Sequence, residues 1–194
     1  MWKSSTGMSQ MLTNVPWSPL AAFSPDNNWF AIVLERAVRL FDLRLRREIQ
    51  SIKGSAGRAV TALAFSQDSA ILAFAEGDGP DQPELRSKVR TVRIWDFRSN
   101  KVQNSLEATQ QVVRLLAFGP AGETSLATAS SAGEILAWDV MRGQLQERFQ
   151  SHTNVASLAL GLDGFLGPFR ILRGIFCRLE VGASGQHACK SWTE

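Results

Sequence analysis

The sequence is poor in the residues that disulfide, metal and histidine chemistry require. Its only two cysteines, Cys177 and Cys189, lie near its end, so disulfide bonds are not expected to stabilise most of the chain. No window holds the roughly 18 uninterrupted apolar residues of a membrane-spanning helix. Residues 1–7 are not followed by the apolar segment of a secretory signal. We therefore expect an intracellular protein, cytoplasmic or nuclear, without a membrane segment.

The few candidate groups for catalysis or metal binding are poorly arranged. Cys177, His187 and Cys189 supply three ligands at uneven spacing, whereas a structural zinc site usually has four ligands in closely spaced pairs. The Ser-His dipeptide at 151–152 would place its two side chains on opposite faces of a strand, which excludes a nucleophile–base pair. The glycines at 54 and 57 are not followed by the Lys-Ser/Thr of a phosphate loop. We therefore predict no enzyme activity, metal, cofactor or small-molecule substrate.

What the chain does contain is typical of a folded, strand-rich protein. Apolar residues make up 44% of the 194 residues and charged residues 20%, enough for one domain with a core or two small ones. Short runs of valine, isoleucine, threonine and aromatic residues alternate with glycine and asparagine turns. The net charge of +3 is mild and does not by itself require a nucleic acid partner.

One strand-like ending recurs three times along the chain. The segment 91–98 alternates apolar Val92 and Ile94 with polar Arg93, which predicts a strand with one face toward a core and the other toward water. It ends in an aromatic-Asp pair, and equivalent pairs occur on both sides: Phe41-Asp42, Trp95-Asp96 and Trp138-Asp139. A repeated strand ending indicates a repeat architecture rather than an active site.

A second landmark repeats at matching intervals. An apolar strand ends in Ala-Phe or Ala-Leu before a Ser-Pro-Asp-like turn, with anchors at Phe23, Phe65, Phe118 and Leu160. The anchors lie 42, 53 and 42 residues apart, and the three aspartates 54 and 43 apart. Both series lengthen in the same unit, and the glycine-, proline- and charge-rich residues 77–88 account for the insertion. The spacing predicts four short antiparallel strands per unit.

These motifs resemble the WD-repeat β-propeller family over residues 18–164. The resemblance implies an all-β fold, a partial propeller of four-stranded antiparallel blades, preceded by an N-terminal segment (1–17) and followed by a divergent tail (165–194). Of the family's Gly-His dipeptide, the histidine falls at Ala56 and Thr109 and is kept only at His152. We expect the blades to be held by the aromatic-Asp pairs and by His152. These structural residues are Phe41, Asp42, Trp95, Asp96, Trp138, Asp139 and His152.

The resemblance stops abruptly after Gly164, where a fourth blade should continue. Two interpretations of residues 165–194 remain open: sequence from another reading frame, a retained intron or a truncated gene, or a segment that caps the last blade. We favour the first, because capping segments are rarely this apolar. Since a closed ring needs about four to eight blades, we expect an open arc that belongs to a larger protein or is completed by another chain.

Charge suggests where partners would bind. Residues 35–58 carry a local net charge of +4, with Arg44, Arg46 and Arg47 at the turn after a strand. Such an edge would contact phosphates or an acidic protein, or would simply be a solvated turn. Arg44 and Arg98 each lie two places after the aspartate. This pattern resembles the Trp-Asp-x-Arg box of cullin ubiquitin ligase substrate receptors; the alternative is an arginine paired with a neighbouring blade's acid.

The leading hypothesis is a non-catalytic scaffold for protein–protein interactions, as a substrate-receptor or assembly subunit of a larger complex. The alternative is a component of a ribonucleoprotein complex that binds RNA through the basic 36–58 edge. A third hypothesis is a regulatory propeller within a longer enzyme. Because binding function concentrates on loops held by a rigid scaffold, the 77–88 insertion is a further candidate contact.

Overall fold

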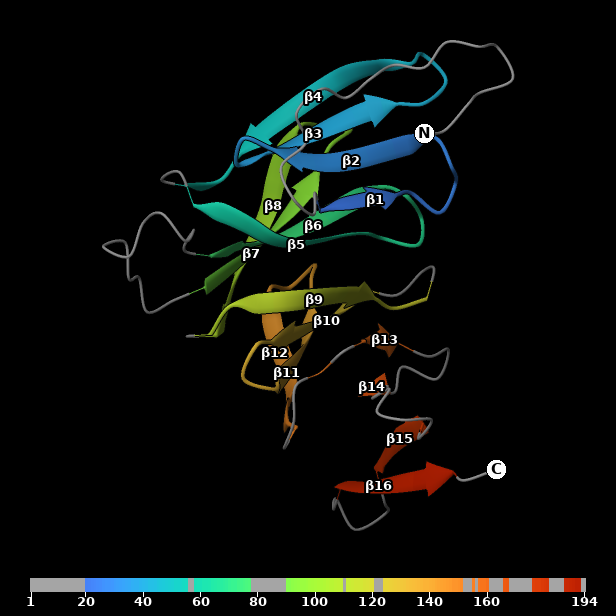
Figure 1. Ribbon diagram of the computed structural model, residues 1–194, viewed down its shortest axis with the longest axis vertical. Helices are drawn as coiled ribbons and strands as arrows, with labels where there is room; N and C mark the ends of the chain where they lie inside the picture. Colours follow the sequence, from blue (N-terminus) through green and yellow to red (C-terminus); the bar gives the residue numbers. More distant parts are fainter. Residues whose placement is uncertain are drawn as a thin grey trace.

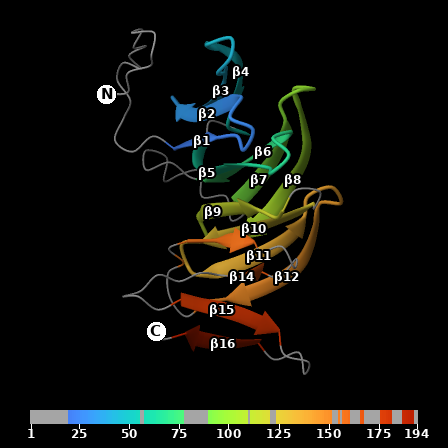
Figure 2. The ribbon, with the colours of Figure 1, turned by 90° about the vertical axis from the view of Figure 1, so that its right-hand side faces the viewer.

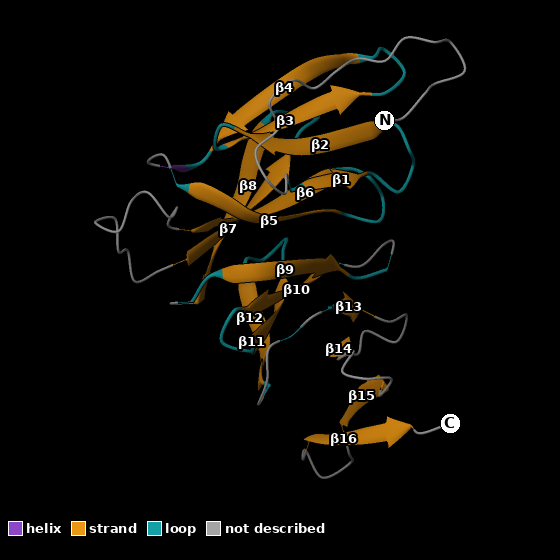
Figure 3. Ribbon diagram, viewed as in Figure 1, coloured by secondary structure: helices purple, strands orange, loops and turns teal. Residues whose placement is uncertain are grey.

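The computed structural model consists of strands joined by turns and loops (Figure 3). None of the residues that it describes belongs to a helix long and apolar enough to cross a membrane. It describes residues 20–55, 58–77, 90–109, 111–120, 124–151, 155, 157–160, 166–167, 176–181 and 187–192.

Twelve of the strands form three four-stranded antiparallel sheets, and each sheet uses four consecutive strands in chain order. We call these sheets blades 1, 2 and 3. Blade 1 comprises β1 (Ala21–Phe23), β2 (Trp29–Leu34), β3 (Ala37–Asp42) and β4 (Arg47–Lys53). Blade 2 comprises β5 (Ala59–Phe65), β6 (Ile71–Gly77), β7 (Arg90–Asp96) and β8 (Lys101–Thr109). Blade 3 comprises β9 (Val113–Phe118), β10 (Ser125–Ser130), β11 (Glu134–Asp139) and β12 (Gln144–Gln150). The predicted all-β class and four-stranded antiparallel blades are confirmed.

Four further strands follow blade 3 and form two small antiparallel sheets. β13 (Ala159–Leu160) pairs with β14 (Leu166–Gly167), and β15 (Phe176–Val181) pairs with β16 (His187–Trp192). The sequence motifs end at Gly164, inside this region, so both interpretations of the tail and the boundaries at 17 and 164 stay predictions. His152 and residues 78–88 of the 77–88 insertion lie outside the described residues.

The blades are stacked in chain order, with the N-terminal blade at one end and β13–β16 at the other (Figures 1 and 2). Each face between two blades encloses a separate core. Trp95, Phe65 and Phe97 of blade 2 pack on Val38 and Leu40 of blade 1. Phe118, Leu126 and Trp138 of blade 3 pack in the same way on Val92 and Ile94 of blade 2. The stack therefore has one apolar layer per blade-to-blade contact.

The expectation that one face of the 91–98 strand meets water is wrong. Val92 and Ile94 face blade 3, whereas Trp95 faces blade 1, so both sides of β7 are buried. Arg93 lies on the Trp95 side, with its guanidinium carbon 5.4 Å from the centre of the Phe74 ring. The reason is that a blade inside a stack has a neighbour on each face. Period-two alternation there separates two cores rather than a core from water.

Candidate functional site

The turn after each aromatic-Asp pair is built around the aspartate side chain. One carboxylate oxygen (Oδ1) of Asp42, Asp96 and Asp139 accepts hydrogen bonds from the backbone N–H groups two and three residues later. These bonds measure 2.8 Å twice after Asp42, 3.0 and 3.1 Å after Asp96, and 3.0 Å twice after Asp139. An aspartate that satisfies the backbone two residues ahead closes a tight turn.

The fourth residue after each aspartate completes the same backbone shape. Arg46, Asn100 and Gly143 occupy this position with φ of 54°, 55° and 66°, in the left-handed region. Asparagine and glycine adopt that region readily, while other side chains are strained there. The three turns thus share one conformation although their residues differ.

This shared conformation divides the residues between aspartate and the left-handed position into inward and outward ones. The residue after the aspartate turns inward in blades 2 and 3, where Phe97 and Val140 are buried. The next residue points to solvent in all three blades: Arg44, Arg98 and Met141 are exposed. The edge of each blade therefore presents its Asp+2 side chain from a fixed backbone.

Hydrogen bonds lower the pKa of two of these aspartates and of Asp26. Partial burial raises the pKa of Asp96, but the bonds from Ser99, Arg98 and Gln103 outweigh it, so the net pKa lies below the ordinary value. For Asp139 the largest effect is the bond from the Arg142 backbone, and its pKa is likewise lowered. At Asp26, burial again raises the pKa and bonds from Ser24, Asn28 and Ser69 reverse the effect.

The lowered pKa values predict a loss of stability in acid. A carboxyl group whose pKa is lower in the folded than in the unfolded state stabilises the fold above its unfolded pKa of about 3.9. That contribution is lost as the pH falls through the folded pKa. The urea midpoint should therefore be insensitive to these groups above about pH 5 and fall below about pH 4. Asp96→Asn should flatten the fall; a midpoint that rises on acidification would contradict the turn geometry.

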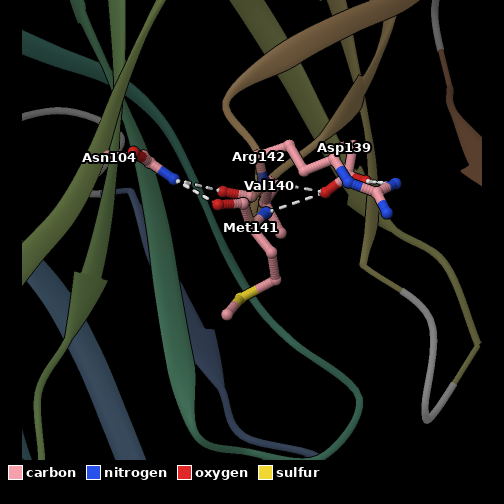
Figure 4. A network of polar contacts seen from close by, with 5 residues as sticks. All are labelled: Asn104, Asp139, Val140, Met141 and Arg142. Atoms are coloured by element: carbon pink, nitrogen blue, oxygen red, sulfur yellow. Dashed lines mark hydrogen bonds and ion pairs between the residues drawn. The ribbon is translucent and has the colours of Figure 1, made fainter.

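Blade 2 also holds the turn of blade 3 directly (Figure 4). The side-chain amide (Nδ2) of Asn104, on β8, donates hydrogen bonds to the backbone oxygens of Val140, at 2.6 Å, and Met141, at 3.1 Å. Arg142 Nη1 lies 3.1 Å from Asp139 Oδ2 in the same turn. Sequence reasoning missed Asn104, because nothing in a polar outer strand marks one amide as a contact to the next blade.

The predicted partner-binding arginines are accessible. Arg44, Arg46 and Arg47 are all exposed at the β3–β4 turn, and Arg98 is exposed at the β7–β8 turn. Two apolar residues, Leu43 and Leu45, are exposed in the first of these turns. Within the described part of the chain, neither Arg44 nor Arg98 forms an ion pair with an acidic residue. The alternative in which these arginines pair with a neighbouring blade has no support among those residues.

The basic segment 36–58 is not one continuous surface. Arg36 lies in the β2–β3 turn, at the opposite end of β3 from Arg44. Between them Arg39 pairs with Glu35, at 3.1 Å, and Glu48, at 3.6 Å. The structure therefore leaves the arginines of the β3–β4 turn as a small local cluster. The RNA-binding alternative depended on one basic edge over residues 36–58, and fewer arginines lie together there than the sequence suggested.

A buried charged contact between blades 1 and 2 was not predicted at all. Arg93 Nη1 donates to the backbone oxygen of Lys53, at 3.1 Å, and lies 3.3 Å from Glu76 Oε1. The same Glu76 oxygen accepts the backbone N–H of Ser55 at 2.9 Å. The pair thus ties the end of β4 and the following loop to β6 and β7. No sequence signal links these positions, because they are adjacent only once the blades stack.

Among residues 20–55, 58–77, 90–109, 111–120 and 124–151 and the shorter described segments, no group of three His, Cys, Asp or Glu could hold a metal ion. The indole N–H groups of Trp95 and Trp138 are used within their own blades: that of Trp95 donates to Asn100 Oδ1 and that of Trp138 to Thr128 Oγ1, both at 3.3 Å.

Solved structures share the architecture of the three blades. No family model matches the chain. The structure of the WD40 repeats of RRP9 superposes with a TM-score of 0.69 at 18% identity, covering 93% of this chain and 53% of that one. The three blades have the fold of WD40 propeller structures. The solved structure of U3-55K is equally similar to this chain, with a TM-score of 0.69, 18% identity and coverage of 93% of this chain and 54% of that one.

Among curated proteins, the chain is similar to the target of rapamycin complex subunit wat1 of Schizosaccharomyces pombe. The two are 28% identical over 145 residues, which cover 73% of this chain and 42% of wat1. The chain thus spans about half the length of the proteins that it matches, or less.

Proposed function

We propose that this protein is a non-catalytic scaffold subunit that docks other proteins of a multi-subunit complex. The observation that carries the proposal is the repeated turn, which holds the exposed Arg44 and Arg98 on identically built blade edges. The similarity to wat1, named as a subunit of a target of rapamycin complex, supports membership of such an assembly. The proposal includes an intracellular site of action.

The docking edge is preorganised and carries a residue type that is favoured at interfaces. Asp42 and Asp96 fix the turn backbone before any partner arrives, so binding does not have to order it. Arginine is enriched at the energetic centres of protein interfaces, and neither Arg44 nor Arg98 is engaged with an acid among the described residues. The exposed Leu43 and Leu45 add apolar surface beside Arg44. The matching position in blade 3, Met141, is apolar, so the docking edge spans blades 1 and 2.

The Trp-Asp-x-Arg positions indicate which kind of partner would bind this edge. Arg98 and Arg44 stand where substrate receptors of cullin ubiquitin ligases place the arginine that reaches their adaptor. We therefore propose an acidic protein surface as the partner of this edge, in a substrate-receptor or assembly role. Electrostatic complementarity of this kind mainly raises association rates and selects partners.

Affinity capture with charge-reversal variants tests the proposal. The double variant Arg44→Glu, Arg98→Glu should lose the proteins that co-purify with the wild type and leave the high-mass fractions of a density gradient. Its melting temperature should be unchanged, since both side chains are exposed. Arg114→Glu, an exposed charge reversal on β9, is the matched control and should keep the partners. An unchanged partner set in the double variant would refute the docking edge.

The same capture separates protein docking from the RNA alternative. Partners held by direct protein contacts should survive nuclease treatment. Partners bridged by RNA should be released by it, and their recovery should fall steeply with salt concentration.

A further inference from the structure

The turns of each blade lie together at one end of that blade. In each blade the first residue of the second strand pairs with the aspartate that ends the third, as Trp29 does with Asp42. The turn between the first two strands therefore lies beside the turn between the last two. In blade 1 the Leu43 N–H donates to the backbone oxygen of Asn28 at 2.9 Å, and the equivalent bond in blade 3 measures 2.8 Å. We call this end of the blades the turn end.

The turn end is held together from blade to blade. The Asp26 N–H donates to Ser69 Oγ at 3.1 Å, which joins the first turns of blades 1 and 2. The Asn104 amide joins blade 2 to the backbone oxygen of Met141 in blade 3, also at 3.1 Å (Figure 4). Because the blades are stacked in chain order (Figures 1 and 2), their turn ends form one surface across all three.

Exposed apolar side chains are concentrated at the turn end. Leu45, Met141 and Leu145 are 58%, 57% and 41% exposed. In the part of the chain that the structure describes, the exposed large apolar side chains all lie in these turns or within two residues of them: Phe23, Leu43, Leu45, Met141 and Leu145. Single exposed apolar residues are common on protein surfaces, whereas their grouping marks an interaction site.

Blade 3 presents an apolar side chain where blades 1 and 2 present a cation. Met141 occupies the position of Arg44 and Arg98, two residues after the aspartate. Its backbone is fixed on both sides: the N–H donates to Asp139 Oδ1 at 3.0 Å, and the oxygen accepts from Asn104 at 3.1 Å (Figure 4). The turn end therefore offers, in chain order, two cations and a preorganised apolar contact.

We propose that the turn end binds a single protein segment in which an apolar side chain and acidic residues lie close together. The apolar side chain packs on Met141 and Leu145 of blade 3. The acidic residues face Arg44 and Arg98 of blades 1 and 2. Since this rests on the proposed docking function, the docking edge on blades 1 and 2 gains an apolar anchor on blade 3.

The charges at the turn end favour a protein segment over a nucleic acid or an anionic membrane. Asp26 and Asp68, in the first turns of blades 1 and 2, are exposed carboxylates at the same end and would repel phosphate groups. The cation next to Met141, Arg142, is already paired with Asp139 at 3.1 Å. Blade 3 therefore contributes an apolar contact, which a protein side chain can cover and a phosphate backbone cannot.

Substitutions at Met141 test the proposal, with retention of the co-purifying proteins on the immobilised full chain as the readout. Met141→Arg would extend the arginine pattern of blades 1 and 2 to all three blades. Because it removes the apolar anchor, this variant should retain about tenfold less of the partner, the loss expected for a residue at an energetic centre. Met141→Leu should retain the partner, because the apolar contact is kept. Ala132→Arg, exposed at the opposite end of blade 3, is the matched control and should bind as the wild type does.

A photo-crosslinking amino acid in place of Met141 identifies what lies against the anchor. Mass spectrometry of the adducts should give peptides with an apolar residue at the crosslink and aspartate or glutamate beside it. The same amino acid in place of Ala132 gives the background. Adducts with nucleic acid or lipid, or peptides no richer in acidic residues than that background, would overturn the proposal.

The two sets of variants separate the apolar anchor from the docking function on which it rests. Partners that are lost from the Arg44→Glu, Arg98→Glu variant but retained by Met141→Arg would overturn the anchor alone. Partners that the double variant retains would refute the docking edge and the anchor with it. Circular dichroism and melting temperature of the Met141 and Ala132 variants should match the wild type, because both side chains are exposed.

Discussion

Replacing Trp95 by alanine is expected to destabilise the protein by about 3–5 kcal/mol, the usual cost of emptying a large aromatic site in a core. The Trp95 side chain is fully buried between blades 1 and 2, and its indole N–H donates to Asn100 Oδ1 at 3.3 Å. It also packs edge-on to Phe97, with ring centroids 6.2 Å apart. A loss of this size is a large fraction of the 5–15 kcal/mol typical of a domain. Urea unfolding monitored by circular dichroism would measure it.

The matched control is Phe23→Ala, an aromatic truncation on the same side of the repeat. Because Phe23 is mostly exposed, its removal should cost less than about 1 kcal/mol. Comparable costs for the two variants would contradict the packing assignment. A Trp95→Ala protein with an unchanged urea midpoint but lost partners would instead make Trp95 a binding residue.

The blade fold was predictable because its signals are local. The Ser-x-Asp turn is one example: Ser66 Oγ donates to Asp68 at 2.6 Å and accepts the N–H of Ile71 at 2.9 Å, within six residues of sequence. The aspartate turn at Asp96 is equally short in range. Strand, turn and strand therefore follow from neighbouring residues, and three copies of the pattern defined the blades before their packing was known.

The contacts between blades were not predictable, because their partners are far apart in sequence. Asn104 meets Val140, and the N–H of Asp26 donates to Ser69 Oγ at 3.1 Å, 43 residues away. The wrong expectation that Arg93 faces water has the same origin. A polar residue in an alternating strand is normally solvated, and only the stacking of blade 1 on that face reverses the expectation.

The features of the candidate site also separate into those that local sequence predicts and those that depend on neighbouring blades. The exposure of Arg44 and Arg98 followed from their place two residues after an aspartate, which the sequence shows. The sequence could not show that Leu43 is partly exposed while Phe97 is buried, because the two residues occupy the same position of the repeat. What differs is the presence of a preceding blade among the described residues. Local pattern thus sets the shape of each turn, and neighbours decide what it exposes.

The Arg93–Glu76 contact is the second place where a single substitution should be severe. The Glu76 side chain is 1% exposed and that of Arg93 is 18% exposed. Arg93→Ala leaves the carboxylate with only the Ser55 N–H at Oε1, and Glu76 Oε2 has no hydrogen-bond partner in the described part of the chain. Removing one partner of a buried pair costs about 3–5 kcal/mol, and the partial exposure of Arg93 points to the lower end. The loss should appear as a lower urea midpoint.

Arg39 is the natural control for this experiment, since it occupies the equivalent position in blade 1. Its side chain is 33% exposed and its partner Glu35 is 84% exposed, so Arg39→Ala should cost less than about 1 kcal/mol. A double-mutant cycle on Arg93 and Glu76 then separates the attraction between the two charges from the cost of removing them from water. The pair Arg93→Met, Glu76→Leu should recover most of the stability that Arg93→Ala loses, because apolar replacements of a buried pair leave no charge unpaired. If the double variant were as unstable as Arg93→Ala alone, the cost would lie in the lost packing on Phe74 and not in the stranded carboxylate.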